Sequence, residues 1–331
     1  MRFLFLGLVI FLVSLSLGSS AFAADEDVLP PRVQKSLTDP KVLAKTKPED
    51  LTFEQELIQS DVMISRFFGS VAEGLDLFLV GKQVTDRRND THVKLENSTF
   101  SNDGQGIREA PSVLVNLRLP NVEEYWSLKF TSYDEEQDRR NVQQSYLGQT
   151  PRQTNYGATV GFFKKLGNVR TSFQPRIELQ NPLKVSHSLL FESVADMKTF
   201  RINPELELFA NPTNGVGTYF AANINIPFSI RNSLTFINNG EYDEKQHIFS
   251  VTNGVSWGHF ISRFSSISYN YIVVSNNRDN YHLDSYSFSV GYSHVLYRNI
   301  FDYQLIPHWD FAKAVSFVGK PGITLVMTLT F

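Results

Sequence analysis

The sequence has 331 residues, is rich in aromatic side chains with 27 Phe, 13 Tyr and 3 Trp, and contains no cysteine. The lack of cysteine excludes disulfides, thiolate metal sites and the lipid-attachment cysteine of a lipoprotein. Because 31 Lys and Arg nearly balance 34 Asp and Glu, the net charge of −3 argues against nucleic acid as a partner and against a polybasic membrane anchor.

Residues 1–23 have the three parts of a secretory signal peptide. Met1-Arg2 forms the charged tip, Phe3 to Leu17 the apolar core, and Ala21-Phe22-Ala23 the small-residue cleavage site. The apolar core is shorter than the roughly 20 residues that a bilayer-spanning helix needs. We therefore expect cleavage after Ala23 and export from the cytoplasm.

Residues 24–51 are acidic, then rich in Pro and Lys, and lack periodicity, which predicts a periplasmic linker. Residues 52–81 predict an amphipathic helix, because Thr52 to Gln55 fits a capping box and Gly81 would end the helix. The apolar stripe of this helix consists of Ile64, Phe67, Phe68, Val71, Leu75 and Phe78. Its partner could be the membrane interface, the barrel predicted below or a neighbouring subunit.

Residues 90–331 form a series of short segments in which apolar and polar residues alternate, separated by stretches rich in turn residues. This period of two predicts strands with one apolar and one polar face. In Val169–Leu179 and Phe200–Leu208 the charged face is as long as the apolar face. A soluble core has no place for such a face, whereas the water-filled lumen of a transmembrane β-barrel does.

Weaker alternation marks further segments at His92 to Thr99, Val185 to Phe191, Ser233 to Ile237, Gln246 to Val255 and Ile261 to Val273. The fold class is therefore all-β: a transmembrane antiparallel β-barrel with an N-terminal amphipathic helix. We expect about fourteen strands, or about twelve if the weak first pair is not part of the wall.

Such barrels alternate short periplasmic turns with longer outer loops. The expected long links are His308 to Pro321, Asn276 to Leu283, Asn238 to Lys245, Ala210 to Gly215 and Asp134 to Gln153.

The polar faces predict which residues line the lumen. They are Arg170, Gln174, Arg176, Glu178, Arg201, Asn203, Glu205, Glu207, Asn223 and Asn225. Opposed charges among them could pair across or along the lumen, either as filling or beside a solute path, and their mixed signs argue against strong ion selectivity. The acidic cluster from Asp134 to Asp138 is followed at once by Arg139 and Arg140, which favours a solvated loop over a binding site.

The sequence offers no constellation for catalysis or metal binding. His187 precedes Ser188 and Ser293 precedes His294, but adjacent residues on a strand point to opposite faces and cannot form a dyad. The seven histidines have no paired metal-ligand spacing. We expect no enzyme activity, no metal and no cofactor; the alternative is a barrel enzyme of the phospholipase or protease type.

The final segment, from Gly322 to Phe331, has strict alternation and a terminal aromatic residue. Its apolar positions are Ile323, Leu325, Met327, Leu329 and Phe331. The segment resembles the C-terminal recognition strand of bacterial outer-membrane β-barrels, and this resemblance implies the barrel-assembly machinery as a partner.

Several short patches carry a wider resemblance. They are Asp61-Val62 to Phe67-Phe68-Gly69, Leu119-Pro120, and Tyr297-Arg298-Asn299-Ile300 through Ile306-Pro307-His308-Trp309 to the final Phe. They resemble a broad group of Gram-negative outer-membrane barrels and are similar to the porin-like, lipid-trapping barrel family described from predatory bacteria. That similarity implies a ring of barrels enclosing membrane lipid, with the helix stripe as subunit contact. We therefore expect a porin-like homo-oligomer in the outer membrane that forms a pore or organises lipid.

Overall fold

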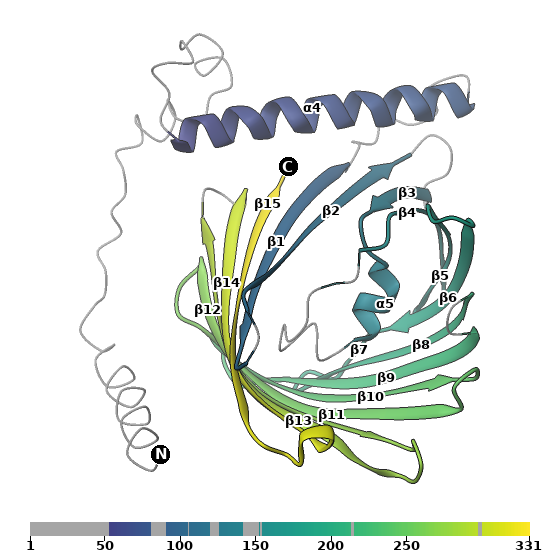
Figure 1. Ribbon diagram of the computed structural model, residues 1–331. Coiled ribbons are helices and arrows are strands. Elements are labelled where there is room, and N and C mark those ends of the chain that lie inside the picture. Colours follow the sequence, from purple (N-terminus) through teal and green to yellow (C-terminus); the bar gives the residue numbers. More distant parts are fainter. Residues whose placement is uncertain are drawn as a thin grey trace. The chain divides into compact units, whose positions relative to one another are not determined.

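The computed structural model describes residues 53–80, 91–104, 106–119, 126–141, 152, 154–212, 215–296 and 300–331 (Figure 1). The expected signal peptide and linker lie outside these residues. The first described element is the helix α4 (Phe53–Val80), which confirms the predicted N-terminal helix. Among the described residues, no helix combines the length and apolar character needed to cross a membrane.

The rest of the described chain is dominated by strands. They are β1 (His92–Asn102), β2 (Arg108–Arg118), β3 (Trp126–Thr131), β4 (Gly157–Leu166), β5 (Val169–Glu178), β6 (Lys184–Ser193), β7 (Ala195–Asp196), β8 (Arg201–Asn211), β9 (Gly215–Pro227), β10 (Asn232–Asp243), β11 (Ile248–Phe260), β12 (Ser265–Asn276), β13 (His282–Leu296), β14 (Phe301–Ala312) and β15 (Lys320–Thr330). Two short helices, α5 (Glu135–Arg140) and the 3₁₀ turn η3 (Lys313–Val315), interrupt the series.

The strands form one closed antiparallel barrel. Strands that follow one another in sequence pair along the sheet, β1 pairs with β15, and β6 pairs with β8, which closes the ring. The two-residue β7 pairs only with β8 and does not count as a strand of the barrel wall. The barrel therefore has 14 strands, which confirms the expected number of about fourteen, and every weakly alternating segment contributes a strand.

The wall is apolar outside and polar inside, as the alternation requires. On β5, Ser172, Gln174 and Arg176 are buried within the barrel, whereas Phe173 and Ile177 are exposed on its outer surface. Exposed apolar side chains continue around the wall with Leu206, Leu208, Phe220, Trp257, Tyr271, Phe288, Trp309, Ile323 and Met327. This inverts the arrangement of a soluble domain and is the arrangement of a transmembrane barrel.

The connections depart from the expected sorting by length. Strands absorb most of the expected long links, leaving turns at 244–247, 277–281 and 313–319. These turns resemble in length those at the opposite end, such as 228–231 and 261–264. The expectation failed because polar residues occupy the inner face of a strand as readily as a loop: Asn239 is buried on the inner face of β10 and pairs with Thr252 within the sheet. The segment 132–156 is the long connection that remains.

The C-terminal strand lies between β1 and β14. Leu329 pairs with Leu95 on one side and with Phe301 on the other. Phe331 extends the pairing, since its N–H donates to the carbonyl of Val93 at 2.8 Å. We refer to the barrel end where β15 finishes as the C-terminal end.

The inside-out arrangement can be tested by labelling single cysteines, because the chain has none of its own. On β9, Asn223 belongs to the inner face and Phe220 is exposed on the outer face. In lipid vesicles we expect Asn223→Cys to react with a charged, water-soluble maleimide at least about tenfold faster than Phe220→Cys, because hydrocarbon excludes the reagent. Equal rates, measured by mass shift, would contradict the outward-facing apolar wall.

Candidate functional site

A charged loop folds into the barrel between β3 and β4 and carries the helix α5 (Figure 1). The helix starts at Asp134, whose carboxylate accepts hydrogen bonds from the N–H groups of Glu136 and Gln137 at 3.1 and 3.2 Å. Acidic residues occupy its first turn, and Arg139 and Arg140 its last turn, which suits the helix dipole. The helix therefore directs two guanidinium groups away from its acidic start.

Both arginines of α5 bind Glu207 on β8, which has no solvent exposure. The Nη1 of Arg140 lies 2.6 Å from Oε1 of Glu207, and Arg139 contacts both Glu207 and Glu205. The hydroxyl of Ser188 on β6 donates to the same Oε1 at 2.6 Å. A buried carboxylate is stable only when paired and hydrogen-bonded, so this cluster fixes α5 to one side of the wall.

A second anchor lies at Arg152, close to the return of the loop to β4. Its guanidinium pairs with Glu96 on β1 and with Asp138 of α5, at 2.8 Å in the latter pair. The same group lies over the ring of Tyr133, 4.7 Å from its centroid. Arg152 therefore ties α5 to β1, whereas Arg139 and Arg140 tie it to β8.

Two further contacts fasten the ends of the loop. Lys129 on β3 pairs with Glu135 at 2.7 Å. Arg176 on β5 donates to the hydroxyl of Thr131 at 2.6 Å and to the backbone carbonyl of Asn155 at 2.5 Å. Together, the anchors connect the loop to β1, β3, β5 and β8.

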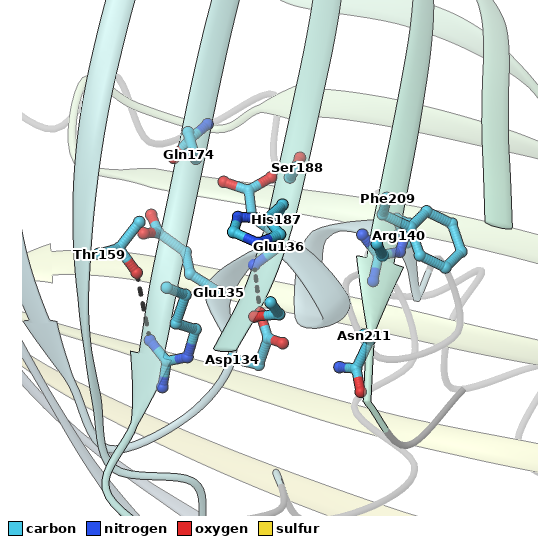
Figure 2. A pocket seen from close by; sticks show the side chains of 13 residues that line it. Asp134, Glu135, Glu136, Arg140, Thr159, Gln174, His187, Ser188, Phe209 and Asn211 are labelled. Atoms are coloured by element: carbon cyan, nitrogen blue, oxygen red, sulfur yellow. Dashed lines mark hydrogen bonds between the residues drawn. The ribbon is translucent and has the colours of Figure 1, made fainter. Parts of the chain in front are cut away.

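Helix α5 packs closely against this wall. Figure 2 shows the space between the helix and strands β4 to β8, with Gln174, Ser188 and Arg140 around it. The cavity there is only about 20 Å³, which is enough for about one water molecule. No organic ligand fits between α5 and the strands that hold it.

The wall formed by β11 to β15 has a different chemistry. Buried polar residues on its inner face are Ser256, Asn270, Ser287, Ser289, His308, Thr324 and Thr328. The hydroxyl of Ser256 donates to the amide oxygen of Asn270 at 2.6 Å, and the Asn270 amide donates to Ser289 at 3.0 Å. The lumen therefore has one wall rich in ion pairs and another rich in uncharged hydroxyl and amide groups.

A larger cavity of about 690 Å³ lies nearer the C-terminal end of the lumen, between β4 and β9. We call it the vestibule. Five of the predicted lumen residues line it: Arg170, Arg201, Asn203, Glu205 and Asn223. Arg201 is largely exposed there and pairs with Asp196 at 2.9 Å.

The other predicted lumen residues lie on the same inner face. Gln174, Arg176, Glu178 and Glu207 are buried in the half of the lumen that holds α5, and Asn225 donates to the hydroxyl of Thr235 at 2.8 Å. The predicted ion pairs between charged residues of the strands are wrong for Glu205 and Glu207. Glu205 and Glu207 bind arginines of the loop, and these arginines were not predicted as site residues.

The interpretation of residues 134–140 as a solvated loop is also wrong. Arg140 is buried, and its guanidinium lies 4.0 Å from the ring centroid of Phe209. The available signal was the order of charges, since an Asp N-cap followed by acids and then bases is typical of a short helix. Sequence polarity alone could not distinguish water outside the barrel from water inside it.

The stripe of α4 stays a prediction. Phe67 and Val71 are exposed, at 63% and 42%, and Ile64, Phe68 and Leu75 are half-buried. The rings of Phe67 and Phe68 meet edge to face, with centroids 5.2 Å apart. The side chain of Phe78 lies outside the described residues.

Solved structures of outer-membrane proteins are similar to this chain at low sequence identity, whereas no protein-family model and no curated protein matches it. OmpTdeltaL8, a loop deletion mutant of the outer membrane protein OmpT of Vibrio cholerae, has 7% identity and a TM-score of 0.45 over 73% of this chain and 99% of that chain. The outer membrane channel DcaP of Acinetobacter baumannii has 7% identity and a TM-score of 0.44 over 74% and 97% of the two chains. The KdgM porin has 9% identity and a TM-score of 0.35 over 72% and 99%. The barrel assignment rests on the strand pairing of this chain itself.

The Glu207 cluster predicts how the loop responds to mutation. Glu207→Ala leaves Arg139 and Arg140 without their shared buried partner, and removing one member of a buried ion pair costs up to about 3–5 kcal/mol. We expect the amides of residues 135–140 to exchange hydrogen at least about tenfold faster while the barrel stays folded. Glu244→Ala, at an exposed turn, is the matched control and should leave that exchange unchanged. Unchanged exchange in the Glu207 variant would contradict this role of the cluster.

The pH dependence of loop docking follows from burial on α5. Burial raises the pKa of Glu136 above its ordinary value of 4.5, against the opposing effect of Arg139, and it also raises the pKa of Asp138. A raised pKa means that the docked loop binds protons more tightly than the free loop. These two groups therefore strengthen docking as pH falls toward 4.5 and weaken it as pH rises.

We expect slower hydrogen exchange of residues 135–140 at pH 4.5 than at pH 7.5, after correction for the intrinsic exchange rate. Glu136→Gln should reduce this difference, because it removes one of the two titrating groups. A corrected rate that rises on acidification would contradict the assignment.

Proposed function

We propose that this chain is a porin-like outer-membrane barrel of a Gram-negative bacterium that passes small hydrophilic solutes through a lumen narrowed by α5. The observation that carries the proposal is the anchoring of α5 inside the barrel by Arg139, Arg140 and Arg152. A loop held by ion pairs along one side reduces the cross-section of a polar lumen. The wall of β11 to β15, on the other side of the lumen, is polar but carries mainly hydroxyl and amide groups in place of ion pairs.

Conductance tests the proposal. The purified protein in a planar bilayer should give small current steps with weak preference between K⁺ and Cl⁻, because charges of both signs line the lumen. Arg139→Ala combined with Arg140→Ala should raise the step size at least about twofold, since the loop loses its bond to Glu207. Arg263→Ala removes a charge at an exposed turn and serves as control. The absence of conductance by the wild-type protein at every voltage would overturn the proposed channel function.

A second part of the proposal concerns assembly. The 63% exposure of Phe67 supports a contact of α4 with another subunit or with membrane lipid, in a homo-oligomer that organises or encloses lipid. The terminal strand β15 is proposed as the segment recognised by the barrel-assembly machinery. Both functions are compatible with one chain, because the first uses the lumen and the second uses α4.

Mild detergent extraction should yield an oligomer that carries lipid. Phe67→Ser combined with Phe68→Ser should lower its mass and lipid content, measured by light scattering and lipid extraction. Glu73→Ser on the same helix is the matched control, because it alters an exposed polar residue. A lipid-free monomer from the wild-type protein would remove this part of the proposal.

We propose no enzyme activity. Among the residues that the structure describes, the arrangement most similar to a hydrolase site is His308, whose Nδ1 lies 2.8 Å from Asp310, with Ser289 directly across the β13–β14 pair. His308 has no solvent exposure, and the Ser289 hydroxyl accepts a hydrogen bond from Asn270. A substrate cannot reach this pair, which favours a structural role in the wall over the alternative of a barrel hydrolase.

A further inference from the structure

Charges in the vestibule form a row across four adjacent strands. Lys165 on β4 pairs in register with Arg170 on β5, Arg170 with Glu192 on β6, and Glu192 with Glu205 on β8. All four side chains line the same cavity of about 690 Å³. The row therefore places two cations beside each other and then two carboxylates beside each other.

The middle of the row does not neutralise itself. Arg170 and Glu192 are direct cross-strand neighbours, yet the Arg170 guanidinium lies over the ring of Phe163, 4.9 Å from its centroid. Within the described part of the chain, no ion pair joins Lys165, Arg170 or Glu192 to a group of opposite charge. Glu205 is shared with Arg139 of α5.

The two cations at one end of the row repel each other, and so do the two carboxylates at the other end, because charges of the same sign that lie directly opposite in a sheet are unfavourable. A bound solute relieves both repulsions if it places an anionic group at Lys165 and Arg170 and a cationic group at Glu192 and Glu205. Neighbouring strands are about 4.8 Å apart, so the centres of the two charge pairs are separated by roughly 10 Å along the wall.

We propose that the vestibule binds zwitterionic solutes whose opposite charges lie several ångströms apart, with short peptides as the class that fits best. The carboxylate of the solute contacts Arg170 and Lys165, and its ammonium group contacts Glu192 and Glu205. Asn203 on β8 and Asn223 on β9 line the same cavity at the carboxylate end of the row, and their amide oxygens offer further acceptors to the ammonium end of the solute. This assignment rests on the proposed channel, since it names the solute class that the lumen selects.

Binding of three related peptides to the detergent-solubilised full chain tests the proposal. Triglycine carries both charges, N-acetyltriglycine only the negative one and triglycine amide only the positive one. We expect triglycine to bind about fivefold more tightly than either analogue, measured by calorimetry, because each analogue loses one partly exposed charge contact.

The variants assign each end of the solute. Arg170→Gln combined with Lys165→Gln should weaken triglycine binding to the level of the amide, and Glu192→Gln to the level of the acetylated peptide. Arg263→Gln, at an exposed turn, is the control and should leave all three affinities unchanged. Equal affinities for the three peptides, no binding of any, or acetylated peptide bound as tightly as triglycine would overturn the zwitterion site.

Conductance in KCl, recorded from the same preparation, separates this proposal from the channel itself. A conducting barrel that does not distinguish the peptides overturns only the zwitterion site. A barrel that shows no conductance but binds triglycine as expected overturns the proposed channel function and leaves the proposed zwitterion site standing.

Discussion

Glu207 has no contact with solvent, and a carboxylate in that position requires partners. The strands supply one, the hydroxyl of Ser188, but neither β6 nor β8 brings a cation to it. Arg139 and Arg140 come instead from α5, a helix that the chain turns inward between β3 and β4. The charge of Glu207 therefore holds α5 at β8, and in the proposed channel the position of α5 sets the cross-section of the lumen.

The same requirement explains why the lumen has two unlike walls. Strands that face the loop of α5 carry charges that bind this loop, such as Glu96, Lys129 and Arg176. The strands from β11 to β15 face no such helix in the described chain and satisfy one another through hydroxyl and amide groups, as in the Ser256, Asn270 and Ser289 ladder. Outside, both halves meet the same demand of hydrocarbon and are equally apolar. The two halves of the barrel therefore differ in the polar groups of their inner faces and share an apolar outer face, because one closed sheet separates water from lipid.

The sequence was enough to predict the strands of the barrel wall and the faces of their residues, but not the position of the loop inside the lumen. Alternation predicted the faces of β5 and β8 because each residue on a strand must face either lipid or water, and the two solvents select opposite side chains. The loop could not be placed in this way, since Asp134 and Arg140 are equally suited to water on either side of the barrel. Its position depends on Glu207, which lies far away in sequence, so the signal is a long-range pairing of charges that no local pattern contains.

Glu205 belongs to both charged sets, because it pairs with Arg139 of α5 and is also the last member of the vestibule row. A cation that approaches Glu205 from the vestibule competes with Arg139 for one carboxylate. Arg139 also binds Glu136 at 3.0 Å and shares Glu207 with Arg140, so loss of Glu205 leaves it with two other acidic partners. The anchoring of α5 is therefore redundant at the point where the vestibule begins, and in the proposed binding mode α5 keeps its position when the ammonium group of a solute occupies Glu205.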